Sequence, residues 1–148
     1  MDQPSVPTAG STPIACDMTD APDTGEERMA EYGRLFAQAL VGRERTTGGI
    51  RFRLRAGDGV EAWLRDLSAR EKACCPFFDF DVAAVGDEVR WDVTVVDDDV
   101  ARAVLDELYH LPETVADGMK GLEDRLTGRG FQMSTNPAGT VTGVRPGA

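Results

Sequence analysis

The chain has 148 residues, of which 41% are hydrophobic, and this is enough for one ordinary domain with its own buried core. Its 26 acidic residues outnumber 16 lysines and arginines, so the formal net charge is -10, which argues against nucleic acid or an anionic membrane surface as a partner. The three cysteines are an odd number, no secretory signal pattern is present, and no apolar run approaches the roughly 20 residues that a bilayer requires. We therefore expect a soluble cytoplasmic protein with reduced thiols.

The N-terminal segment, residues 1–13, is rich in Pro, Ser, Thr and Gly and poor in large hydrophobic side chains. It is expected to be disordered, because burial cannot offset the entropy lost when it becomes ordered. A small apolar stretch around Cys16 follows and is suited to dock back on the domain. From Glu26, hydrophobic residues recur at helical spacing and predict a first amphipathic helix that ends near Val41–Gly42.

A polar connection over 46–49 leads to a predicted strand over 50–55, in which hydrophobic side chains alternate with three arginines. A basic row of this kind also suits a phosphate backbone, but in an acidic chain we expect the neighbouring strands to supply the counter-charges. A second amphipathic helix is predicted over 60–74. Pro76 ends it, because proline disfavours helical geometry at the residue before it.

A β-hairpin is predicted next, with strands over 78–84 and 89–95 and a turn at Gly86–Asp87. Its register puts all the apolar side chains on one face. The same register sets Asp81 opposite Asp92, an unfavourable like-charge pair unless the arginines of the first strand lie alongside.

A third helix is predicted from the three aspartates at 97–99, whose charges suit a helix N-terminus, to about Leu111. A narrower apolar stripe over 112–126 predicts an extra helix. This helix either covers the domain edge or pairs with a second copy of the chain, giving a homodimer through 113–126. The tail over 127–148 is expected to be disordered.

These elements predict one α+β domain over 14–126. Their order is helix, strand, helix, hairpin and helix (αβαββα), which gives a three-stranded antiparallel or mixed sheet packed by amphipathic helices. Such an arrangement is close to half of a ferredoxin-like fold.

Cys74 and Cys75 stand at the corner between the second helix and the hairpin. A disulfide between these neighbours would close a small strained ring and would act as a switch. Nucleophilic catalysis requires a lowered thiol pKa, whereas a helix C-terminus disfavours a thiolate. Structural burial is the simplest alternative, because small residues in front of two phenylalanines suit a core.

Coordination of a soft ion is the other chemistry that this corner suits, since thiolates are the preferred ligands of such ions. Glu71 lies three and four residues before the two cysteines and therefore faces the same side of the helix. If Cys16 folds back, it completes a three-sulfur site for Hg(II), As(III) or Cd(II), and for Zn(II) if Glu71, His110 or water adds a fourth ligand. From the residues alone, metal binding and core packing both remain open.

The run Glu-x-x-Cys-Cys-Pro-Phe-Phe, from Glu71 to Phe78, follows a short Ala15–Cys16 segment and precedes a hairpin and a helix that ends at Leu108–His110. This pattern resembles a small domain that is common in actinobacteria and is found alone or behind the DNA-binding half of MerR-type metal-responsive regulators. The resemblance covers about residues 14–111. No helix-turn-helix precedes the pattern, so DNA binding does not carry over, and residues 112–148 extend past it.

The resemblance implies thiol-based handling of a metal or metalloid, and it gives Cys16 a place in the site. We therefore expect soft metal or metalloid binding (Hg, As, Cd or Zn) for sequestration, delivery or sensing, with Zn or another thiophilic ion as cofactor. The expected partner is a metal ion or a small thiophilic ligand. The alternative is a thiol- or metal-dependent enzyme, a lyase or transferase with the Cys-Cys corner as its active site, and the third hypothesis is an interaction module with structurally buried cysteines.

Overall fold

The computed structural model describes residues 15–16, 18, 20–135 and 141–144. In chain order these residues form β1 (Ala15–Cys16), α1 (Gly25–Ala39), β2 (Leu40–Thr46), β3 (Gly49–Arg55), α2 (Val60–Cys74), β4 (Phe78–Val85), β5 (Glu88–Val95), α3 (Asp99–Thr114), a 3-10 turn (Val115–Asp117), α4 (Gly118–Gly128), β6 (Gln132–Thr135) and β7 (Val141–Val144). In this part of the chain, every helix is too short or too polar to span a bilayer. The segment 1–13, which the sequence predicts to be disordered, lies outside the described residues.

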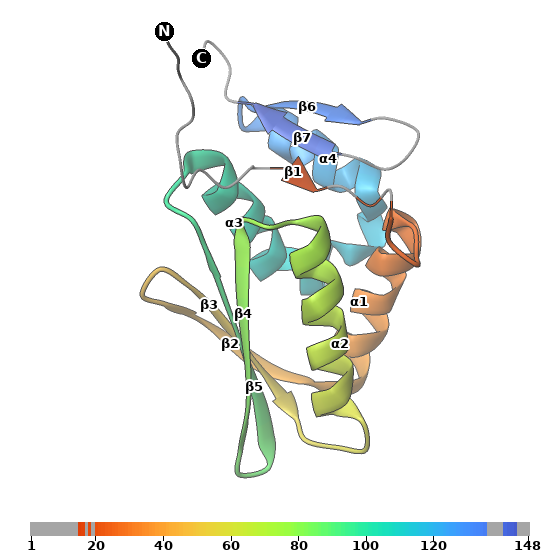
Figure 1. Cartoon of the computed structure of the whole chain (residues 1–148), viewed down its shortest axis with the longest axis vertical. Coiled ribbons are helices and arrows are strands. Elements are labelled where there is room, and N and C mark those ends of the chain that lie inside the picture. Colours follow the sequence, from red (N-terminus) through yellow and green to blue (C-terminus); the bar gives the residue numbers. More distant parts are fainter. Residues whose placement is uncertain (1–14, 17, 19, 136–140, 145–148) are drawn as a thin grey trace, which may run out of the picture.

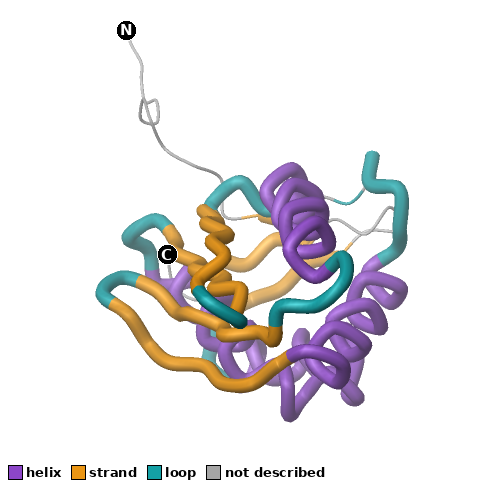
Figure 2. Tube along the Cα trace, turned by 90° about the horizontal axis from the view of Figure 1, so that it is seen from below, coloured by secondary structure: helices purple, strands orange, loops and turns teal. Residues whose placement is uncertain are grey.

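The main sheet is antiparallel and has four strands in the order β2-β3-β5-β4, and its apolar face is covered by α1, α2 and α3 (Figure 1). Seen from below, most of the strands lie on one side of the molecule, with helices along the other (Figure 2). The predicted α+β class is confirmed. The sheet has one strand more than the three that the sequence predicts.

The additional strand is β2, in a region where the sequence indicates only a helix end and a polar connection. Its two arginines cause the difference, because Arg43 lies opposite Phe52 and Arg45 opposite Ile50, on the helix-covered face of the sheet. Arg43 donates a hydrogen bond to the Tyr109 carbonyl oxygen at 2.8 Å, and the Arg45 guanidinium lies 4.2 Å from the Tyr109 ring centroid. The inward face of this edge strand is therefore built from long cationic side chains, and it gives no hydrophobic alternation.

The core lies between the sheet and the three helices. Its largest fully buried side chains include Trp91, Phe52, Phe77, Leu35, Ile50, Leu54, Leu64 and Leu67. The hairpin of β4 and β5 has the predicted register, with Val82 opposite Trp91 and Asp81 opposite Asp92. Each fully buried side chain of this size contributes about 1.5–3 kcal/mol relative to an exposed one, so the hairpin is anchored mainly through its apolar face.

The open face of the sheet carries the arginines of β3 among acidic side chains. Arg51 donates two hydrogen bonds to Asp92, at 2.7 and 3.0 Å. Arg53 donates to Glu44 at 3.0 Å and to Glu88 at 3.1 Å. For Arg51 and Arg53, these pairs confirm the interpretation that neighbouring strands supply the counter-charges. Arg55 instead donates to the Gln38 carbonyl oxygen at 3.0 Å.

Helix α2 has the predicted bounds and delivers the two cysteines to one end of the sheet. The Cys75 amide still donates to the Glu71 carbonyl oxygen at 2.7 Å, but Cys75 has left helical geometry, with φ -125° and ψ 79°. The Lys72 ammonium donates to the carbonyl oxygens of Pro76 at 2.9 Å and Phe78 at 2.7 Å. Lys72 therefore stabilises the turn between α2 and β4.

The C-terminal third of the chain contains more structure than its composition indicates. Helix α3 begins at the cap Asp98, whose carboxylate accepts from two backbone amides, and continues through Pro112 to Thr114. Helix α4 packs against α1 and α3, so its apolar stripe covers an edge of the domain. Within 127–148, predicted to be a disordered tail, the described residues end α4 and form β6 and β7, and β7 also pairs with β1.

Candidate functional site

Three of the predicted site residues, Glu71, Cys74 and Cys75, line one small cavity of about 120 Å³. Residues of α1, α2, α3 and α4 line it, together with Met18, which lies between β1 and α1. The rest of the wall is largely aliphatic and sulfur-bearing, with Met18, Met29, Phe78, Val104, Leu108, Leu111, Met119 and Leu122. We call this space, defined by its two cysteines and three methionines, the sulfur cavity.

The two neighbouring cysteines are in different chemical states. Cys74 is a free, buried thiol, whereas Cys75 is disulfide-bonded. A disulfide between the two neighbours is therefore absent from this structure. Cys74 also lines a second hollow, of about 210 Å³, whose wall includes Asp20, Ala21 and Pro22. Cys74 is therefore shared by the sulfur cavity and this second hollow.

Burial raises the pKa of the Cys74 thiol, because the low-polarity surroundings penalise a thiolate, while the Arg28 guanidinium acts in the opposite direction. The pKa stays above its ordinary value of 9.0. A thiol of this kind is largely protonated near neutral pH and is a weak nucleophile. The raised pKa therefore argues against Cys74 as a catalytic nucleophile unless an ion activates the thiol.

Glu71 is held at the cavity wall by two partners. One carboxylate oxygen accepts from Arg28 Nη1, and the other accepts from the Tyr32 hydroxyl at 2.6 Å. Burial and the adjacent Glu71 carboxylate raise the pKa of Tyr32 well above its ordinary range, so this hydroxyl remains a donor. Each Glu71 oxygen accepts one hydrogen bond and keeps a second lone pair that could coordinate a metal ion.

Arg28 joins Glu71 to the start of α1. Its guanidinium donates two hydrogen bonds to Asp23, both at 2.7 Å, and its side chain is only 5% exposed. The hydrogen bond from Arg28 holds the pKa of Asp23 below its ordinary value although burial acts the other way. Arg70 adds a longer bond to Asp23 at 3.2 Å. Arg28 of α1 and Arg70 of α2 therefore hold the segment from Asp20 to Asp23 next to Cys74 through their bonds to Asp23.

Cys16, the third predicted thiol ligand, is described only in its backbone. It lies in β1, opposite Val141 of β7. The side chain of Cys16 lies outside the described residues, so its part in the site stays a prediction.

His110, the remaining predicted ligand, is not among the residues that line the sulfur cavity. Its side chain is 52% exposed, and Nε2 lies 3.9 Å from Asp106 Oδ1. Among the described side chains, no group of three or more His, Cys, Asp or Glu residues is placed to hold a metal ion. A metal site at this corner would therefore need a donor from outside that set, such as Cys16, a methionine or water.

Sequence reasoning did not assign Arg28 and the methionines to the site. Met29 and Met119 appear there as ordinary members of apolar helical stripes, and Met18 as part of an apolar stretch. A signal does exist for Arg28, since it precedes Tyr32 by four residues and therefore shares a helix face with it. That Arg28 is buried against Glu71 could not be predicted, because this contact depends on where α2 packs.

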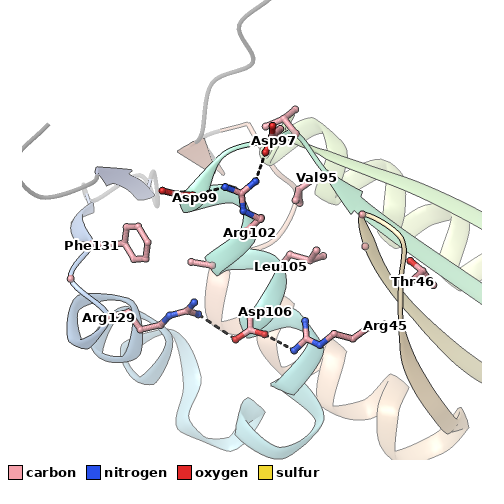
Figure 3. A pocket seen from close by; sticks show the side chains of 15 residues that line it. Arg45, Thr46, Val95, Asp97, Asp99, Arg102, Leu105, Asp106, Arg129 and Phe131 are labelled. Atoms are coloured by element: carbon pink, nitrogen blue, oxygen red, sulfur yellow. Dashed lines mark hydrogen bonds and ion pairs between the residues drawn. The ribbon is translucent and has the colours of Figure 1, made fainter.

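A second, larger pocket of about 880 Å³ lies between β2, α3 and the end of α4, and we call it the arginine pocket after Arg45, Arg102 and Arg129 (Figure 3). Asp106 accepts from Arg45 at 2.5 Å and from Arg129 at 3.3 Å, and Arg102 donates to Asp97 and Asp99. The arginines and aspartates therefore neutralise one another.

Comparison with known proteins gives no relative for this chain: no protein-family model, no curated protein and no solved structure matches it. The resemblance to the MerR-associated domain stays a prediction. The side chains of the sulfur cavity are therefore the basis for assigning a function.

Proposed function

We propose that the protein binds a soft metal or metalloid ion through Cys74, Cys75 and Cys16, for sequestration, delivery or sensing. The observation that carries the proposal is the convergence of a free thiol and a second cysteine on one sulfur-lined cavity. Thiolate and thioether sulfur are the donors that soft ions prefer. The largely apolar wall lowers the local polarity, which strengthens the interaction between a cation and a thiolate.

The three-thiol form requires reduction of the Cys75 disulfide. An external dithiol supplies two electrons and two protons, leaves two protein thiols, and is itself oxidised to a disulfide. In the cytoplasm, where we propose that the protein works, glutathione and thioredoxin maintain such reducing conditions. The disulfide would then be a metal-free, oxidised form of the same site.

Metal binding is compatible with a thiol whose pKa is raised by burial. A bound cation displaces the thiol proton, since its charge stabilises the thiolate far more than burial destabilises it. Arg28 stabilises the thiolate further. In the Zn(II) form, water or Glu71 would supply the fourth ligand.

The decisive experiment counts reactive thiols in the reduced protein, with and without one equivalent of Cd(II), Hg(II) or As(III). Three reactive thiols without metal and protection of all three with metal are expected. Elemental analysis of protein purified without an affinity metal identifies an ion that is already bound. The proposal fails if one equivalent of each ion leaves the thiol count unchanged.

Structural burial of the cysteines is the competing explanation, and it has an observation of its own, because Cys74 and Cys75 are only 4% and 5% exposed. Purely structural thiols would remain unreactive in the reduced, metal-free fold. The thiol count therefore separates the two functions.

A further inference from the structure

The thioethers around the sulfur cavity come from parts of the chain that are far apart. Met18 lies between β1 and α1, Met29 belongs to α1 and Met119 to α4, while Cys74 ends α2. Methionine often fills gaps in a core. Here, however, three thioethers share one cavity with the free thiol.

The charge of a bound ion decides which metal this set of donors suits. With Cys75 in its disulfide, Cys74 is the thiol that the described side chains offer. The charged residues that also line the cavity are paired, Arg28 with Glu71 and Glu107 with Arg125, so their charges largely cancel. The Cys74 thiolate then neutralises a monovalent cation, whereas a divalent cation would leave a net positive charge in a largely apolar cavity, at a large cost. Thioethers donate electron density without adding charge, and Cu(I) is among the metals that thiolate and thioether ligands select.

We propose that the sulfur cavity binds Cu(I) through the Cys74 thiolate and the thioethers of Met18, Met29 and Met119. The inference rests on the proposed function, in that the same corner binds soft ions, but it does not require reduction of the disulfide. Cu(I) replaces the Cys74 proton, one copper–sulfur bond to the thiolate forms, the proton leaves to solvent, and no electron is transferred.

The size and surroundings of the cavity agree with a single bare ion. A volume of about 120 Å³ leaves room for an ion without a full hydration shell. The second hollow beside Asp20–Pro22 reaches the same thiol from another side. A Cu(I) carrier could approach Cys74 there and transfer the ion to the thioethers behind it.

The test is an anaerobic titration of the disulfide-intact full-length protein with Cu(I), in competition with bathocuproine disulfonate and with ascorbate as a reductant that carries no thiol. One equivalent of Cu(I) should bind, and X-ray absorption should show sulfur ligands alone. Replacing the three cavity methionines with leucine conserves volume. Together, these replacements should weaken Cu(I) binding at least about tenfold, the lower limit for losing supporting groups at a metal site.

Leu111→Ile serves as the matched control, since it repacks the same wall without removing sulfur, and its Cu(I) affinity should equal that of the unmodified protein. Unchanged affinity in the triple Met→Leu variant would overturn the inference, as would absence of binding to the disulfide-intact form. Neither result affects binding of Cd(II), Hg(II) or As(III) to the reduced protein, which tests the proposed function separately.

Discussion

The sulfur cavity and the arginine pocket are opposites in size and in chemistry. The arginine pocket is the larger, at about 880 Å³ against 120 Å³, but each of its arginines is already paired with an aspartate. The sulfur cavity is small and apolar, and it contains a free thiol and three thioethers. The difference shows that the volume of a hollow says less about function than the donor atoms in it that remain available to a ligand.

The largest expected contrast between the two regions concerns stability. Arg28→Leu should lower the free energy of unfolding by about 3–5 kcal/mol, because Asp23 and Glu71 would lose the cation that compensates their burial. The matched control Arg102→Leu, in the arginine pocket, should cost about 0–1 kcal/mol, since that side chain is 51% exposed. Denaturant unfolding measures both values, and equal losses would contradict the contrast.

Binding of thiophilic ions should depend on the sulfur cavity alone. Cys74→Ser should weaken the affinity of the reduced protein for Cd(II) by about 100-fold or more, because a direct ligand is lost where even supporting groups cost 10–100-fold. Arg45→Gln should leave that affinity unchanged. Competition with a chromophoric chelator measures the two affinities, and a Cys74→Ser variant that binds as tightly as the unmodified protein would rule out this site.

The pH dependence of stability should also differ between the regions. The pKa of Asp23 is lower in the fold than its ordinary value of 3.8. Its ion pair therefore stabilises the fold fully above that value, and the stabilisation is lost as the pH falls through the folded pKa. Asp23→Asn should flatten the decline of the unfolding free energy below about pH 4.

Asp97→Asn is the control variant for this measurement at acid pH. Asp97 lies in the arginine pocket, and its side chain is 98% exposed. Its unfolding free energy should follow that of the unmodified protein throughout the titration. An Asp23→Asn curve that also overlays the unmodified protein would show that the ion pairs of Asp23 do not contribute.

The smallest effect is expected for Arg129→Gln. The ion pair of Arg129 with Asp106 is 3.3 Å long and partly exposed, and Asp106 keeps its bond to Arg45. A loss within about 0–1 kcal/mol is expected from denaturant unfolding, and it should shrink further at high salt. A larger loss of unfolding free energy would show that this ion pair contributes more to stability than its exposure indicates.

Much of the fold could be predicted from local patterns. The end of α2 was predictable because proline acts on the residue before it, and the hairpin register because apolar side chains must share one face. Strand β2 was not, since its inward side chains are Arg43 and Arg45, which pack on Tyr109 of a helix more than sixty residues away. Alternation of apolar and polar residues indicates a strand only where the inward-facing side chains are apolar.

The candidate site could be predicted only in part, for a related reason. Glu71, Cys74 and Cys75 share a helix end, so their spacing sufficed to group them. The ion pair of Glu71 with Arg28 and the approach of Met119 to the same cavity depend on how α1 and α4 pack. Such contacts between distant segments are decided by tertiary structure, and no local spacing encodes them.

The ion pairs that hold the segment Asp20–Asp23 over Cys74 affect how fast a reagent reaches the Cys74 thiol. The segment Asp20–Asp23 is fastened through Asp23 to Arg28, whose side chain is 5% exposed, and to Arg70, whose side chain is 19% exposed. Dissolved salt screens the more exposed pair with Arg70, whereas burial shields the pair with Arg28. Local opening of this segment should therefore quicken with ionic strength, whereas the apolar core should respond little. The alkylation rate of Cys74 should then rise with added salt while global stability changes little, so that access to the thiol is controlled by the ionic medium.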